Sequence, residues 1–226
     1  MTVEPVNYKH AVPHRPDGAS RRATHALRRR RTLAAATEVF ASQGYHLATM
    51  AEIAHRTGWS KPILYKQFSG KLELYLAVLQ EHIDALTRSV QHALHSTKSN
   101  RGRVYAAVQA YFDFVDHETQ GFRLIFDSDV TSEPAVQWRV GRAIDDSVNA
   151  ITDTIANDAM LNLSQARLLA AGLVGASQFG AKYWLDTGCQ VPKAEAVAAI
   201  ATLCWGGLAS VPLDRLVDEN SVSANE

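Results

Sequence analysis

The chain has 226 residues, of which 46% are hydrophobic and 20% are charged. This composition suits one or two globular domains with a sizeable core. The formal net charge is zero, but residues 1–75 hold twelve Lys and Arg against five Asp and Glu, whereas residues 76–226 hold eleven against eighteen. This distribution indicates that the first part of the chain, and not the remainder, meets a polyanion such as DNA.

No apolar run in the sequence approaches ~18 residues, so we expect no segment that spans a membrane. The N-terminus lacks the apolar core of a secretory signal. Two cysteines, Cys189 and Cys204, are typical of reduced thiols in a chain of this size, although a disulfide between them is conceivable. We therefore expect a cytoplasmic protein without a membrane partner.

The first 27 residues contain three prolines, a glycine and no sustained apolar periodicity, which predicts a disordered arm. Four consecutive arginines follow at 28–31. They can be a solvated start to the first helix, or they can follow DNA phosphates or enter the minor groove. In the second interpretation, Arg28 and Arg30 are candidate DNA contacts.

An apolar stripe predicts a first helix from about residue 28 to 43, which Gly44 ends. The next stretch predicts a short helix that Thr49 caps, with the side chain of Glu52 reaching back to the Thr49 N–H. Gly58 suits the left-handed conformation that stops this helix. We expect the core of the resulting three-helix domain to contain Phe40, Leu47, Ile53, Leu64 and Phe68.

A second short helix opens near Ser60, and proline suits its first turn. Its inward positions are apolar, and its outward face carries two cations, a phenol and no acid. The outward residues are Lys61, Pro62, Tyr65 and Lys66. A short basic helix held against a capped partner is what a helix-turn-helix inserts into the major groove. The alternative is an ordinary helical hairpin with a solvated lysine face.

A long amphipathic helix follows almost without a linker, capped by Ser69. Any tilt of this helix must move the preceding short helix, which makes it a natural lever between domains. His82, His92 and His95 lie along it, but no Asp, Glu or Cys shares a convincing ligand spacing with them. We therefore expect no metal site.

From residue 101 onward the chain is helical and rich in aromatic side chains, which are core residues by default, although a lipophilic cavity is a hypothesis. In the last two helices, small residues recur at four-residue spacing and then next to a tryptophan. These candidate dimer-interface residues are Gly172, Ala176, Gly180, Trp205 and Gly206. They favour either a four-helix dimer seam or close packing inside one subunit. No motif for catalysis is present, so we expect a protein that is not an enzyme and binds no cofactor.

Residues 28–75 resemble the DNA-binding domain of the TetR family of bacterial regulators, and the resemblance is carried by FASQGYHLATMAEIAHRTGWSKPILYKQFSGKLEL. It implies an all-α fold with a three-helix helix-turn-helix domain at 28–70 and a larger helical ligand-binding and dimerisation domain at 71–213. A disordered arm at 1–27 and a flexible tail at 214–226 flank them. It also implies a homodimer on a palindromic operator in double-stranded DNA. The positions that match the family's reading helix are Ser60, Lys61, Pro62, Tyr65 and Lys66, and those that match its phosphate contacts are Thr49 and Lys71.

The stretches SKPILYKQFSGKLELYLAVL, HETQGFRLIF, GLVGAS, KYWLD and WGGLASVPL are similar to one subgroup, the actinobacterial regulators of fatty acid synthase genes. This similarity implies long-chain acyl-CoA as the effector ligand, and an apolar tunnel with cations at its mouth. Candidate lining residues are Tyr105, Val108, Phe112, Phe122, Phe126, Trp138 and Leu173, and candidate phosphate partners are Arg123, Arg139 and Arg142. The alternatives are a regulator of efflux or catabolic genes that senses another lipophile, and a small-molecule binding or transport protein.

Overall fold

The structure is a computed structural model that describes residues 18–130, 132–158 and 162–207. These residues form helices and no strand, as the sequence predicts. Along the chain the helices are α1 (Gly18–Leu47), α2 (Met50–Thr57), α3 (Lys61–Gln67), α4 (Lys71–His95), α5 (Asn100–His117), α6 (Thr119–Phe126), α7 (Pro134–Asp158), α8 (Leu163–Asp186) and α9 (Lys193–Gly206). None of them is both long enough and apolar enough to cross a membrane.

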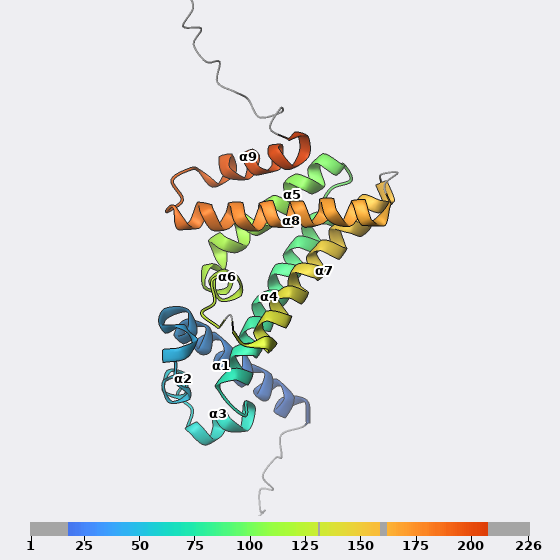
Figure 1. Cartoon of the computed structure of the whole chain (residues 1–226). Coiled ribbons are helices and arrows are strands. Elements are labelled where there is room, and N and C mark those ends of the chain that lie inside the picture. The colour runs from blue at the N-terminus through green and yellow to red at the C-terminus, as the bar shows by residue number, and fades with distance from the viewer. Residues whose placement is uncertain (1–17, 131, 159–161, 208–226) are drawn as a thin grey trace, which may run out of the picture.

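Helices α1 to α3 gather at one end of the molecule, and α8 and α9 lie across the opposite end (Figure 1). Helices α4 and α7 pack together along the length between these ends, and α5 packs against α4, α8 and α9. Helix α6 contacts both α1 and α4. The end that holds α1 to α3 therefore meets the rest of the chain through α4, α6 and the loop after α6.

Helix α1 begins at Gly18, ten residues before the predicted start, so the prediction of disorder was wrong for residues 18–27. The reason is composition, because alanine, arginine and leucine dominate this segment and favour helix, while the three prolines all precede it. The rest of the predicted arm and the predicted tail at 214–226 lie outside the described residues. Gly44 interrupts α1 with φ 75° and ψ 169°, which confirms it as the end of regular helix.

The expected caps of α2 are present. The Thr49 hydroxyl accepts a hydrogen bond from the Glu52 N–H at 3.2 Å, and Gly58 is left-handed with φ 72° and ψ 14°. The Glu52 carboxylate does not reach back to Thr49, however. It accepts a hydrogen bond from Gln43 Nε2 at 2.6 Å and lies 3.5 Å from a guanidinium nitrogen of Arg56. Partners on α1 and one turn further along α2 replace the predicted capping box.

Most of the predicted core of the first three helices is buried, with Leu47 as the exception. Its side chain is 76% exposed, because Gly44 breaks the helix before it and shifts the phase of the stripe. The N-cap of α4 is Gly70, and the predicted cap Ser69 instead donates its N–H and O–H to Glu73 Oε2 at 2.6 and 2.7 Å.

Candidate DNA-reading helix, effector cavity and dimer face

Helix α3 presents the predicted reading face to solvent. Leu64 is fully buried and anchors the helix, whereas the predicted contacts Ser60, Lys61, Pro62, Tyr65 and Lys66 are all exposed. Tyr65 is 51% exposed, and Ile63, which the sequence analysis missed, is 37% exposed on the same short helix. The arrangement offers two cations, a phenol and apolar surface to a groove, with no carboxylate in α3 to repel phosphate.

The four arginines at 28–31, in the first half of α1, lie beside this unit. The guanidinium of Arg28 stands 5.6 Å from the centre of the Trp59 ring, and that of Arg29 stands 4.9 Å from the centre of the Phe68 ring. Both distances suit cation–π contacts. Arg28 and Arg30 are exposed, so they remain candidate phosphate contacts next to the turn that precedes α3.

Lys71, at the first position of α4, bonds to the end of α1. Its ammonium donates to three carbonyl oxygens at the end of α1 and just after it, those of Tyr45 (2.8 Å), His46 (3.1 Å) and Ala48 (3.1 Å). It also lies 4.5 Å from the centre of the Tyr45 ring. An ammonium has three donors, so all of them are engaged here. Lys71 therefore links α4 to the end of α1 in the free chain, and its contact with a DNA phosphate stays a prediction.

The seven predicted ligand-lining residues differ in burial in the structure. Val108, Phe112, Phe122 and Leu173 are buried in the core, while Tyr105 and Trp138 lie on the surface. Phe126 lines a cavity between α6, α7 and α8. Amphipathic periodicity identifies buried positions, and a tightly packed core leaves no room beside most of them.

A mostly apolar cavity of about 420 Å³ lies between α6, α7 and α8. Phe122 packs against its edge, with its ring centre 4.8 Å from that of Phe126. The lining residues are Ile125, Phe126, Ser128, Val136, Gln137, Val140, Gly141, Ile144 and Gln178. The signal in the sequence is the spacing of Val136, Val140 and Ile144 on one face of α7, a pattern that is equally typical of core positions.

The three predicted cations at the tunnel mouth lie on the helices that border this cavity. Arg123 is exposed on α6. On α7, Arg139 donates to Gln80 Oε1 at 2.8 Å, and the guanidinium of Arg142 stands 5.5 Å from the centre of the Trp138 ring. Within this group, Arg139 is already engaged with α4.

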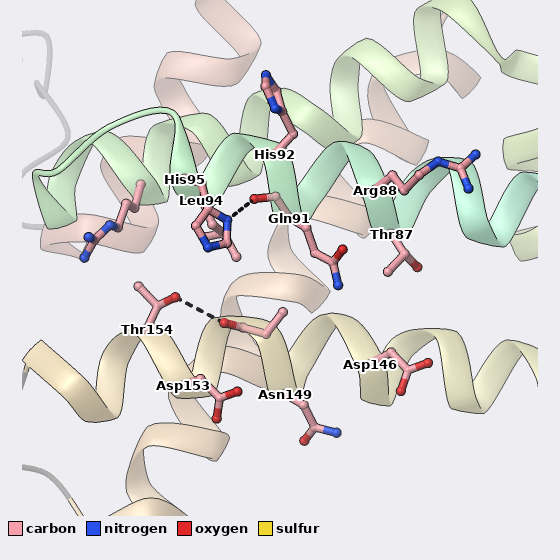
Figure 2. A pocket seen from close by; sticks show the side chains of 12 residues that line it. Thr87, Arg88, Gln91, His92, Leu94, His95, Asp146, Asn149, Asp153 and Thr154 are labelled. Carbon is pink, nitrogen blue, oxygen red and sulfur yellow. Dashed lines mark hydrogen bonds between the residues drawn. The ribbon is translucent and has the colours of Figure 1, made fainter.

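A larger cleft of about 970 Å³ separates the second halves of α4 and α7 (Figure 2). Most of its lining residues are polar or charged, with Arg88 and His95 on one helix and Asp146 and Asp153 on the other. His95 Nδ1 donates to the Gln91 carbonyl at 2.7 Å. The carboxylates of Asp146 and Asp153 would repel phosphates on the α7 side of this cleft, whereas the smaller cavity has no carboxylate in its lining.

Helix α8 carries a stripe of exposed apolar and small residues. A Cβ added to Gly172 would meet nothing within 4 Å, whereas one added to Gly180 would lie 3.0 Å from Ile200 of α9. Gly180 is therefore packed inside the subunit, whereas the role of Gly172 in a dimer seam stays a prediction. Large exposed residues on the stripe, which the sequence analysis missed, are Leu168, Phe179 and Tyr183, and the predicted Trp205 and Gly206 are exposed on α9.

Residues 33–78 match the family described as bacterial regulatory proteins, tetR family. Over 204 residues the chain is 48% identical to the HTH-type transcriptional activator FasR of Mycolicibacterium smegmatis, a match that covers 89% of this chain and 93% of that protein. The chain belongs to the TetR family. Two solved structures share the fold. FadR from Bacillus halodurans has a TM-score of 0.69 at 16% identity, covering 81% of this chain and 97% of that one. FadR from Bacillus subtilis in complex with stearoyl-CoA has a TM-score of 0.67 at 14% identity, covering 79% and 98%.

In this TetR-family chain, a buried histidine joins the DNA-reading end to the rest. His82 Nε2 of α4 lies 3.2 Å from the Thr37 hydroxyl of α1, and Nδ1 lies 3.6 Å from Glu118 Oε2. Because Thr37 donates its own proton to the Leu33 carbonyl at 3.0 Å, His82 Nε2 acts as the donor. Burial lowers the pKa of His82, although Glu118 and Glu81 oppose that shift. Among the described residues, no three metal-ligating side chains come together, here or elsewhere.

Proposed function

We propose that this protein is a transcriptional regulator of fatty acid synthase genes, that it binds a palindromic operator as a cytoplasmic homodimer, and that long-chain acyl-CoA changes its operator affinity. The observation that carries the proposal is the 48% identity to FasR across 93% of that protein. Because that relative is named an activator, we propose that this protein also activates transcription. The exposed, acid-free face of α3 supports the DNA-reading part of the proposal.

The cavity between α6, α7 and α8 is our candidate site for the acyl chain. Its volume of about 420 Å³ lies within the range of about 300–1,000 Å³ that is usual for small-molecule sites. Phe126 lines the cavity, and its ring packs against that of the buried Phe122. Arg123 of α6 and Arg142 of α7 are exposed on helices that border the cavity. They are our candidates for binding the coenzyme phosphates.

The proposed dimer face predicts a change of oligomeric state on substitution. Phe179 is 71% exposed in the single chain, so Phe179→Glu should fold normally. In a two-fold dimer each substitution occurs twice and brings like charges together. We expect Phe179→Glu to weaken dimerisation by at least about 2 kcal/mol, the size of an interface hot spot. Light scattering after gel filtration measures the resulting shift from dimer to monomer.

A matched control for this variant is Leu47→Glu, which places the same charge on an exposed apolar residue at the other end of the molecule. It should remain dimeric. A Phe179→Glu variant that stays dimeric at micromolar concentration would place the dimer seam elsewhere.

The test of the proposed function is operator binding with and without palmitoyl-CoA at one fixed salt concentration. The DNA is the promoter of a fatty acid synthase gene from the same organism. A typical coupling of ~1–3 kcal/mol predicts a change of about 5- to 150-fold in affinity, and operator should change palmitoyl-CoA affinity by the same factor. Free CoA, which lacks the chain, should have no effect.

Three outcomes of this test are informative. A response to palmitoyl-CoA and not to CoA supports the whole proposal. Tight operator binding that palmitoyl-CoA does not change supports operator recognition and refutes acyl-CoA as the effector. No binding above that to random DNA removes the fatty acid synthase promoter as target.

A further inference from the structure

Asp129, in the loop between α6 and α7, touches the end of the DNA-reading part. Its Oδ1 accepts a hydrogen bond from the Tyr45 N–H at 3.1 Å. Its Oδ2 lies against Gly44, so close that a Cβ added there would stand 2.7 Å from it. The conformation of Gly44, with φ 75° and ψ 169°, is essentially restricted to glycine. A carboxylate thus holds the chain at the point where α1 breaks and turns toward α2.

The two residues before Asp129 tie the same loop to two other helices. Asp127 Oδ1 lies 2.9 Å from Lys182 Nζ of α8. The Ser128 hydroxyl lies 2.6 Å from the Tyr75 hydroxyl of α4. Three consecutive side chains therefore connect the proposed dimer helix, the lever helix and the end of α1.

This loop also borders the apolar cavity. Ser128 is one of the cavity's lining residues, and its Oγ accepts a hydrogen bond from the Val130 N–H at 3.1 Å. Asp129 lies between these two bonded residues. A chain that enters the cavity and displaces Ser128 must therefore move the carboxylate of Asp129 with it.

We propose that Asp129 is the positioning residue through which occupancy of the α6–α7–α8 cavity alters DNA binding, because it fixes Gly44 and Tyr45 in one arrangement. This rests on the proposed function for the identity of the ligand, but not for the geometry of the coupling. When the loop shifts, the Tyr45 N–H loses its acceptor and the turn before α2 is released. The two reading helices then move relative to one another.

The first experiment compares Asp129→Ala with the full-length wild-type dimer, with palmitoyl-CoA as the probe. We expect the wild-type change in operator affinity of about 5- to 150-fold to fall below about 2-fold in Asp129→Ala, while palmitoyl-CoA affinity stays within about 2-fold of wild type. Asp129→Asn keeps an oxygen that can accept from Tyr45 and should retain most of the response. Asp145→Ala, which removes an exposed acid of α7 paired with Arg167, should respond as wild type does.

A second experiment needs no ligand. Gly141 lines the cavity, and a side chain added there has open space. Gly141→Phe should fill the cavity and change operator affinity by itself, and the change should disappear in Gly141→Phe with Asp129→Ala.

These two experiments separate the possible failures. A wild-type protein that ignores palmitoyl-CoA refutes the proposed effector, and the Gly141→Phe pair then still decides the role of Asp129. If Asp129→Ala keeps the full response to palmitoyl-CoA, or the Gly141→Phe effect persists without Asp129, the positioning role is wrong.

Discussion

Replacing Lys71 with methionine is expected to lower the free energy of unfolding by about 2–3 kcal/mol and to weaken operator binding indirectly. The ammonium of Lys71 donates to three carbonyls at the end of α1. A hydrogen bond to a charged group is worth about 1.5–3 kcal/mol, but water can replace part of this at a half-exposed helix end. Methionine keeps the apolar stem and removes the donors. Thermal or urea unfolding measures the loss.

The salt dependence of DNA binding distinguishes a structural role of Lys71 at the end of α1 from a contact with a DNA phosphate. A lost phosphate contact lowers the slope of log K against log salt by about one and leaves stability unchanged. Lys71→Met should do the reverse, with an unchanged slope and lower stability. Lys66→Met is the matched control, because Lys66 is exposed on α3. A normal unfolding curve together with a reduced slope for Lys71→Met would show that Lys71 contacts a DNA phosphate.

Features set by neighbours in sequence were predicted, whereas features set by distant partners were not. Thr49 and Gly58 act on backbone groups within five residues, so their roles follow from spacing alone. The side chain of Lys71 meets carbonyls 23 to 26 residues away, and Asp129 meets an N–H 84 residues away. No local pattern records such pairings.

The candidate effector site shows the same limit in another form. Phe112 and Phe126 were both predicted to line the ligand site, yet Phe112 is buried against Trp184 and Phe126 lines a cavity. A void is a property of several helices together, and its walls depend on crossing angles and side-chain volumes. Likewise Gly172 and Gly180 share one spacing, but α9 covers only the second of them.

Substituting Tyr65 with alanine is expected to lower affinity for the operator by about 1–3 kcal/mol per subunit, the usual worth of a base contact. The substitution occurs in both reading heads of a dimer, so the two losses add. Tyr65 is 51% exposed on α3, and a change at such a position should alter stability by no more than about 0.5 kcal/mol. Binding to operator and to random DNA, measured at several salt concentrations, gives the loss of specific affinity and any change in the salt slope.

The comparison with Lys66→Ala shows whether Tyr65 reads bases or only holds the backbone. Lys66→Ala should weaken operator and random DNA by the same factor and reduce the salt slope by about one per subunit. Tyr65→Ala should weaken the operator alone, leave the slope unchanged and relax the preference at one position of each half-site. If Tyr65→Ala weakened both DNAs equally, the phenol would be a backbone contact. Recognition of the DNA bases would then depend on Ser60, Lys61 and Pro62 at the start of α3, where the helix N-terminus enters the groove first.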